Sequence, residues 1–205
     1  MTYKKMIFLF ILLLSNSTSL MKYNFIMSVR NLIIISNTPE IYNIASKQII
    51  GSCNKLSLEH IFPKSYMNKK SGAYNDLHNI FKCNNYINNY RSNYKFTDFN
   101  RTSVEFKQLL NTDNYINTKE QLFIPEKESR GIIARSIMYM SYEYNLNFNK
   151  IIDNDLLIEW CLKYPVTKTE QHHAYLVFLK QFRKNRFIDM YNKKNYIRYI
   201  NNLFL

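Results

Sequence analysis

The residues best suited to chemistry in this sequence stand in three short segments that follow one another closely. Glu59 and His60 are adjacent, Asp76 begins the run Asp-Leu-His-Asn, and Asn88 follows in an asparagine-rich stretch. A carboxylate and an amide oxygen together suit a hard divalent cation, and a neutral imidazole accepts a proton near pH 7. These residue types in this order are typical of the metal-assisted hydrolysis of a phosphodiester bond.

Each member of this set also has a simpler explanation when it is taken alone. A lone histidine such as His60 is more often a core residue satisfied by one hydrogen bond, and Asn88 could be one surface residue among many asparagines. Adjacent side chains on a strand point to opposite faces, so Glu59 and His60 can share a site only where the strand ends or twists. Pro63 lies close enough to permit such an end.

The segments that must position these residues have the patterns of a strand, a loop, a second strand and a helix. A histidine on the first strand and an amide on the helix can then meet around one ion. The ranges expected for these four elements are 56–62, 64–74, 76–82 and 84–91.

Further helices are expected in the second half of the chain, over 129–144, 155–163 and 167–182. Thr167 and Glu170 have the spacing of a capping box at the start of the last one. The apolar stripes of all three predict core packing. Near the N-terminus, 32–35 could be a short strand and 40–50 has a helical pattern.

Composition indicates a globular protein with a basic surface. The chain has 205 residues, 46% of them hydrophobic, which suits an α+β, mostly helical single domain. Its 28 Lys and Arg outnumber 15 Asp and Glu, giving a net charge of +13 that attracts polyanions, although a solvated basic face is the simpler alternative. From residue 163 onward there are nine Lys or Arg and two acids, interleaved with aromatic residues such as Phe182 and Phe187. This mixture favours phosphate contact combined with stacking.

The N-terminus has the pattern of a signal peptide, expected over 1–20. Lys4 and Lys5 precede a nine-residue apolar run that gives way to small polar residues, which predicts a secreted or periplasmic protein. The run is too short for a stable membrane anchor, which needs about 20 apolar residues. A cleaved anchor, or a later start at Met21 or Met27, remains an alternative, and no role is assigned to 21–55.

The three cysteines, Cys53, Cys83 and Cys161, allow at most one disulfide and lack the spacing of a zinc site.

Taken together, six blocks of this sequence resemble the endonuclease I family. That family comprises bacterial periplasmic and secreted nucleases built on a ββα-metal (His-Me finger) core. The resemblance covers roughly residues 56–189, so the nuclease domain is placed at 56–190 and 191–205 is expected to be a basic, aromatic tail. The blocks lie at 58–65, 76–80, 88–93, 123–135, 160–166 and 185–189.

The resemblance implies a division of labour among the residues first singled out. Glu59 and Asn88 would bind Mg²⁺, with Mn²⁺ or Ca²⁺ as alternatives, and His60 would be the general base. Arg135 and Arg91 would hold the phosphate, although a surface salt bridge is an equal alternative for Arg91. Asp76 and His78 would orient the strand and metal loop, and His172 and His173 are left as surface residues. The remaining nucleic-acid contacts are expected from Lys64, Lys69, Lys70, Arg130, Lys180, Arg183, Lys184 and Arg186.

The expected activity is metal-dependent and largely sequence-nonspecific cleavage of DNA, and RNA is a second substrate to be considered, with products ending in a 5′-phosphate. The protein would act as a monomer, and no inhibitor or immunity partner can be named. Two rivals stand beside this reading: a non-catalytic nucleic-acid-binding protein, and an HNH-like effector nuclease. The loop after His60 is shorter than in many relatives and offers lysines where some of them carry an arginine.

Overall fold

The computed structural model describes residues 39–41, 56–191 and 196–204, all of which belong to one unit that extends from Thr38 to Leu205. The predicted signal peptide, nearly all of 21–55 and Cys53 lie outside these residues. The described part combines helices with two small sheets, which confirms the α+β class. Cys83 and Cys161 are buried free thiols. Among the described helices, none combines the length and apolar character needed to cross a membrane.

The first sheet and the helix after it form a ββα unit. Strand β2 (Leu56–His60) pairs antiparallel with β3 (Ile80–Asn84), and β1 (Glu40–Ile41) pairs parallel with the other edge of β3. Helix α3 (Asn85–Arg91) follows β3 directly because the side chain of Asn84 caps it, accepting hydrogen bonds from the backbone N–H groups of Tyr86 and Ile87. The predicted strand, strand and helix are therefore all present, within a few residues of their expected bounds.

Three expectations about this part of the chain are corrected. The segment from Asp76 to Asn79 was expected to be strand, but it forms a 3₁₀ turn, η4 (Leu77–Asn79), because the Asp76 carboxylate accepts the backbone N–H of His78. The expected loop contains two further turns, η2 (Lys64–Tyr66) and η3 (Gly72–Asn75). Glu40–Ile41, expected to begin a helix, is strand.

A second sheet follows the ββα unit. Its order is β4 (Lys95–Phe96), β7 (Leu122–Ile124), β6 (Tyr115–Asn117) and β5 (Lys107–Gln108), and the turn η5 (Phe99–Arg101) lies between β4 and β5. Phe96 and Phe123 are fully buried and place the β4–β7 pair in the core. Strand β7 then runs into the longest helix of the domain.

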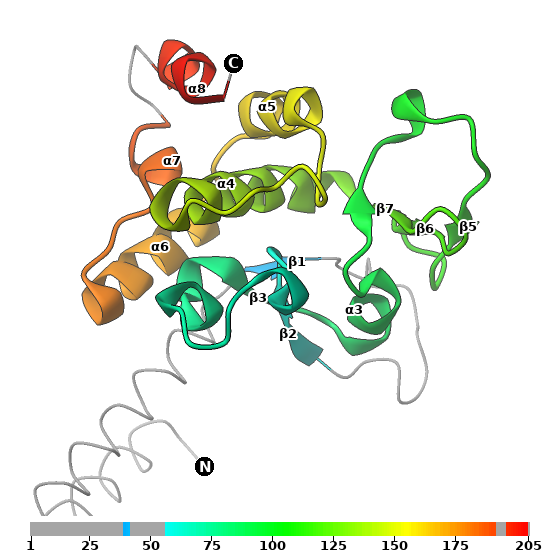
Figure 1. Ribbon diagram of the computed structural model, residues 1–205, viewed down its shortest axis with the longest axis horizontal. Helices are drawn as coiled ribbons and strands as arrows, with labels where there is room; N and C mark the ends of the chain where they lie inside the picture. The colour runs from blue at the N-terminus through cyan, green and yellow to red at the C-terminus, as the bar shows by residue number, and fades with distance from the viewer. Residues whose placement is uncertain (1–38, 42–55, 192–195, 205) are drawn as a thin grey trace, which may run out of the picture. The chain divides into compact units, whose positions relative to one another are not determined.

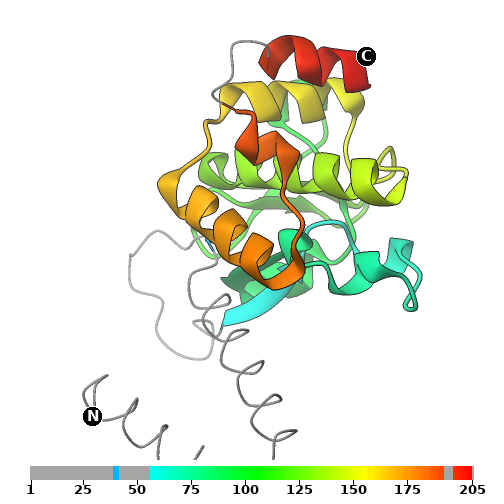
Figure 2. The same ribbon diagram turned by 90° about the vertical axis from the view of Figure 1, so that its left-hand side faces the viewer.

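That helix, α4 (Lys127–Tyr144), is the centre of the helical layer. Every side chain from Ser129 to Met140 is buried, because other elements cover α4 on several sides. Figures 1 and 2 show it between the ββα unit on one side and α5 (Asn154–Lys163) and α8 (Tyr196–Phe204) on the other. Helices α6 (Lys168–Gln181) and α7 (Arg186–Asp189) complete the layer.

The C-terminal residues contribute to the core as well. In α8, Tyr196 and Ile200 are buried, and the Tyr196 hydroxyl lies 3.1 Å from the Cys161 sulfur of α5 and donates to the Phe187 carbonyl. The predicted start of α6 is confirmed, since the Thr167 hydroxyl accepts the backbone N–H of Glu170. The carboxylate of Glu170 turns away from the cap and into the protein.

Candidate active site

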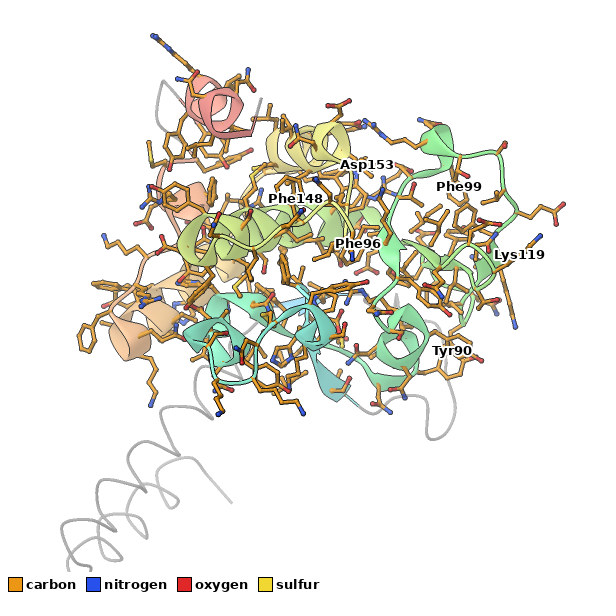
Figure 3. All side chains as sticks on the ribbon, viewed as in Figure 1. Tyr90, Phe96, Phe99, Lys119, Phe148 and Asp153 are labelled. Atoms are coloured by element: carbon orange, nitrogen blue, oxygen red, sulfur yellow. The ribbon has the colours of Figure 1, made fainter. Side chains whose placement is uncertain are left out.

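The three residues first singled out line one cavity. Glu59 and His60 at the end of β2 and Asn88 on α3 all border a space of about 370 Å³, together with Lys64 and Ser92. In Figure 3 the labelled Tyr90 marks α3, the helix that carries Asn88. The remaining lining residues are Leu58, Pro63, Ser65 and Asn93.

The end of β2 is fixed by a side chain that clamps the backbone. Asn79 is fully buried; its Oδ1 accepts the N–H of Phe62 and its Nδ2 donates to the Phe62 carbonyl, at 2.7 and 3.0 Å. The N–H of Ile61 also donates to the Asn79 carbonyl. The chain therefore leaves the strand immediately after His60, as the proline at position 63 suggested, and adjacent side chains of opposite strand faces can border the same cavity.

Glu59 is held by an enclosed arginine. Its Oε1 lies 2.8 Å from the Arg91 Nη1, and the two side chains are 5% and 0% exposed. Arg91 Nη2 donates to the carbonyl of Ile61, Nη1 to that of Ser92, and the guanidinium lies over the Phe96 ring. Arg91 was expected to hold a phosphate; here it is enclosed by protein groups and fixes the carboxylate that borders the cavity.

Asn88 is oriented by a serine on the strand it faces. Its Nδ2 donates to the Ser57 Oγ at 2.9 Å, and because an amide has a donor end and an acceptor end, this bond fixes which end is which. The amide oxygen is thereby left as the acceptor end of the side chain. Ser57 precedes Glu59 by two residues, so both side chains project from the same face of β2 toward α3.

His60 is neutral at physiological pH. Partial burial and the neighbouring charge of Lys64 lower the pKa of its imidazole to about 4, while a hydrogen bond with the backbone of Tyr74 opposes the shift. A neutral imidazole that uses one nitrogen as a donor keeps the other as an acceptor. The ring can therefore accept a proton from a water molecule in the cavity.

The turn after α3 holds Ser92 in a backbone conformation that is unfavourable for residues other than glycine. Ser92 has φ 51° and ψ −116°, a region that glycine occupies most easily, and the Tyr94 N–H closes the turn on the Arg91 carbonyl at 2.9 Å. This turn keeps the last residues of α3 against the cavity. Backbone strain of this kind often occurs beside functional sites.

Asp76 and His78 lie in a buried hydrogen-bond network beside the ββα unit. The Asp76 Oδ2 accepts from the hydroxyls of Tyr139 and Tyr144, at 2.9 and 2.6 Å, and so ties η4 to helix α4. The His78 ring contacts the Arg183 carbonyl at 3.0 Å and packs on Tyr139. Neither residue lines the cavity.

The predicted phosphate-binding residues fall into two groups. Lys64 lines the cavity, and Lys69 and Lys70 are exposed on the loop that follows it. Arg183 and Lys184 are exposed beyond α6. The rest of the late group is partly exposed: Lys180, and Arg186 stacked on the Tyr142 ring.

The structure does not bring Arg135 or Arg130 to the cavity. Arg135 is 1% exposed, and its Nε and Nη2 donate to the two carboxylate oxygens of Glu170 at 2.8 and 2.7 Å. Arg130 pairs with Asp98 and lies over the Trp160 ring. Helix α4 is packed tightly beside these arginines. A Cβ on Gly131 would lie 2.7 Å from the Tyr164 carbonyl oxygen, which also accepts a hydrogen bond from Arg135.

Sequence reasoning missed two contributors to the site, Ser57 and Asn79, and the burial of one histidine outside it. Ser57 could have been found from its two-residue spacing to Glu59, which puts both on one strand face. Asn79 stands within the resembling blocks without an assigned role, and nothing local to it indicates the Phe62 clamp. His173 was expected at the surface but is buried against Phe81, a contact that the pattern of α6 does not reveal.

The donors at the cavity suit one class of metal. Among the described residues no group of three or more His, Cys, Asp or Glu side chains is arranged to hold an ion. The cavity instead offers one carboxylate oxygen donor and one neutral amide oxygen. These hard ligands fit Mg²⁺ or a similar cation whose remaining ligands are water molecules, and they fit zinc poorly.

Comparisons with known proteins identify the family to which this sequence is similar. The family described as Endonuclease I matches residues 17–191. An "Endonuclease-1" of Buchnera aphidicola subsp. Acyrthosiphon pisum is 28% identical over 113 residues, 55% of this chain and 44% of that protein. A "Periplasmic deoxyribonuclease" of Aeromonas hydrophila is 30% identical over 123 residues, 60% of this chain and 49% of that protein.

The chain thus spans about half the length of these curated relatives. The family match, in contrast, runs through both sheets and helices α3 to α7. It includes the cavity at the end of β2 and the buried arginines of α4. The chain belongs to the endonuclease I family.

Proposed function

We propose that this protein is a divalent-metal-dependent endonuclease that hydrolyses DNA with little sequence specificity, and that the cavity at the end of β2 is its active site. The observation that carries the proposal is the convergence of Glu59, His60 and Asn88, from a strand and a helix, on one open cavity. Family membership and the names of the relatives, which include deoxyribonucleases, support the same activity.

In this proposal Glu59 and Asn88 bind the cation. Arg91 holds the carboxylate of Glu59 in place, and Ser57 turns the amide so that its oxygen is the ligand. The cation, when bound, supplies positive charge to the phosphate oxygens and to the leaving oxygen as the bond breaks. Mg²⁺ fits these oxygen donors, and Mn²⁺ or Ca²⁺ can take the same position.

His60 removes a proton from the attacking water. Its lowered pKa keeps the ring neutral, and the bond to the Tyr74 backbone fixes its orientation. Attack by water on the phosphorus, with the 3′ oxygen leaving, gives products that carry a 5′-phosphate. Arg91 and Arg135 are enclosed by protein groups, so we assign phosphate contact at the cavity to Lys64, with Lys69 and Lys70 on the same loop beyond it.

Little sequence specificity is expected because these contacts are made with the backbone of the nucleic acid. Lysine contacts to phosphate position the strand without reading bases, and they weaken steeply as salt rises. RNA shares the same phosphodiester and is a second substrate to test. The relatives named periplasmic and extracellular support action outside the cytoplasm, which accords with the signal peptide expected over 1–20.

Cleavage of supercoiled plasmid with and without Mg²⁺ tests this function. The wild-type chain should nick and linearise the plasmid only with the metal present. His60→Ala should lower the rate by about 10²–10⁴-fold, the usual contribution of a general base. His172→Ala, an exposed histidine on α6, is the matched control and should cleave at the wild-type rate.

Two results decide against the proposal. If the wild-type chain and His60→Ala retard DNA on a gel but neither cleaves it, the protein is a binding module. If both cleave equally, the reaction takes place elsewhere.

A further inference from the structure

A face of helix α6 exposes large apolar side chains next to the core of the domain. Tyr175, Leu179 and Phe182 are 57%, 49% and 81% exposed. Their spacing of four and three residues places them on one side of the helix. Single exposed hydrophobic residues are common on proteins, but an aligned row of this kind often marks a contact surface.

Phe182 has a backbone conformation that other residue types adopt more easily. It ends α6 in the left-handed conformation, φ 56° and ψ 25°, and its N–H donates to the Phe178 carbonyl at 2.7 Å. Glycine or asparagine adopts this conformation with less strain. Capping the helix therefore does not account for a large ring at this position, and its exposure means that core packing does not account for it either.

Beside this row lies a cavity of about 300 Å³ between α6 and α7. Tyr175 and Phe178 supply rings to its wall, and Gln171 and Asp189 supply polar groups. The Lys184 Nζ lies 5.3 Å from the centre of the Phe178 ring and 3.6 Å from the Asp189 carboxylate. A flat aromatic wall with hydrogen-bonding groups at its edge has the form of a site for a planar heterocycle.

The charges around this cavity select an anionic partner. Lys180, Arg183 and Lys184 follow one another closely at the end of α6, and the acid that lines the cavity, Asp189, is paired with Lys184. Arg183 is exposed while its Nη1 donates to the Tyr144 hydroxyl and its guanidinium lies over that ring, so its position is fixed. Rings for stacking and cations for phosphate are the two elements of single-strand nucleic-acid binding.

We propose that this region, the α6 surface (Tyr175, Phe178, Leu179, Phe182, Arg183 and Lys184), binds unpaired nucleotides of the nucleic-acid substrate. A base stacks on the rings of Tyr175, Phe178 and Phe182, and Arg183 and Lys184 contact the adjoining phosphates. The proposal deepens the function proposed above and rests on it for the identity of the substrate.

The α6 surface is connected to the ββα unit by direct hydrogen bonds. The N–H of Leu77 in η4 donates to the Gln181 Oε1 at 2.7 Å, and the His78 ring contacts the Arg183 carbonyl. Strand β3 begins immediately after η4. A strand held on the α6 surface is therefore held at a fixed position relative to the cavity, and substrates with unpaired segments are retained better than continuous duplex.

The test compares two labelled oligomers that differ only in their bases. Fluorescence anisotropy is measured for the full chain with His60→Ala, which prevents cleavage, on a 20-nucleotide oligothymidylate and on an abasic oligomer of the same length. Adding Phe182→Asn and Tyr175→Gln removes two rings, and asparagine suits the left-handed position, so the fold is retained. This change should weaken oligothymidylate binding by about tenfold or more and abasic binding by less than about twofold.

Phe99→Asn is the matched control. Phe99 is also an exposed aromatic residue, 49% accessible, and Figure 3 shows it on the opposite side of the domain from α6. It should leave both affinities unchanged. Equal weakening for the two oligomers, or no weakening, would overturn the proposal. It would also be overturned if the ring substitutions abolished binding to anionic lipid vesicles and left oligothymidylate binding intact.

This result is independent of the cleavage assay. If the wild-type chain fails to cut plasmid but the ring substitutions selectively weaken oligothymidylate binding, the proposed function fails and the α6 surface stands. If plasmid is cut but the oligomer affinities do not change, the α6 surface fails and the active-site proposal stands.

Discussion

The cavity at the end of β2 and the arginines of α4 use similar residues in opposite ways. At the cavity, Glu59, His60 and Asn88 border open space and their positions are set by groups behind them. On α4, Arg130 and Arg135 are 5% and 1% exposed and are bonded to acids and carbonyls of the protein itself. The first arrangement offers groups to a ligand, whereas the second joins helices to one another.

The charged side chains of this protein therefore act in two different ways. An arginine close in sequence to a reactive motif need not touch the substrate. Arg91 follows Asn88 by three residues, yet its buried side chain forms an ion pair with Glu59. Changes at the cavity should therefore reduce activity and leave stability nearly intact. Changes at the buried arginines of α4 should lower stability.

The largest effect on stability is expected at Arg135. Arg135→Met leaves the Glu170 carboxylate buried without its partner, and the loss of one member of a buried ion pair costs about 3–5 kcal/mol of unfolding free energy. Urea denaturation measures it. Arg101→Met is the control: Arg101 pairs with Glu159 at the surface, where such a pair contributes about 0–1 kcal/mol. A stable Arg135→Met protein that cannot cleave DNA would show that Arg135 contacts phosphate after all.

At the cavity, Ser57→Ala should reduce metal affinity and not stability. Without the Ser57 hydroxyl the Asn88 amide is free to rotate, and residues that orient a metal ligand typically contribute about 10–100-fold to affinity or activity. The Mg²⁺ concentration for half-maximal cleavage should rise by that factor. Ser65→Ala, which also lines the cavity but bonds only weakly to Asn93, should not change it. Equal Mg²⁺ requirements in the two variants would mean that Ser57 has no positioning role.

Alanine substitutions at two glycines compare the packing around helix α4 with the packing around turn η3. Gly131→Ala places a methyl group 2.7 Å from the Tyr164 carbonyl and should cost about 1–3 kcal/mol through overpacking. Gly72→Ala meets its nearest neighbour, Tyr144, at 3.7 Å and should change stability by less than about 0.5 kcal/mol. Thermal melting of both variants checks the prediction, which fails if they melt together.

The packing of α6 on strand β3 should respond to pH through His173, which lies against Phe81. Burial, followed by the charge of His78, lowers the pKa of His173 to about 3, well below its value of about 6.5 in the unfolded chain. The unfolded state then binds the extra proton first. His173 thus contributes stability that is fully present above pH 6.5 and is lost as pH falls toward 3, about 1 kcal/mol of it between pH 6.5 and 5.5.

Unfolding free energies measured across that interval check the assignment. His173→Gln should reduce the pH dependence by this share of about 1 kcal/mol, because it removes one titrating group, and should leave the shares of His60 and His78, whose pKa values burial also lowers. The exposed neighbour provides the comparison: His172→Gln should retain the wild-type slope. A pH dependence in His173→Gln as large as that of the wild type would place this share of the titration at another residue.

The sequence predicted what depends on local patterns. Strand β2, helix α3 and the helices of the second half lie within a few residues of their expected ranges, because apolar spacing and caps such as that of Thr167 are local signals. The prediction of a strand after Asp76 was wrong, also for a local reason. The residues alternate as in a strand, but the Asp76 carboxylate accepts a hydrogen bond from the backbone N–H of His78 and so favours a turn.

What could not be predicted depends on partners far away in the chain. Arg135 meets Glu170 and Arg130 meets Asp98 only after the helices have packed, so nothing near either arginine shows that it is enclosed. The burial of His173 against Phe81 has the same origin. Tertiary packing decides whether a charged residue is exposed, and the sequence shows only its chemical type.

The proposed active site assigns metal binding to the amide of Asn88 and no such role to the amide of its neighbour Asn89. Asn88 lines the cavity and Asn89 is exposed on the next position of the same helix, so the two form a matched pair. The decisive measurement is the Mg²⁺ dependence of plasmid cleavage by Asn88→Ala and Asn89→Ala. We predict that Asn88→Ala requires at least about tenfold more Mg²⁺ or loses activity, while Asn89→Ala matches the wild type. Indistinguishable Mg²⁺ curves for the two variants would show that Asn88 is not a metal ligand.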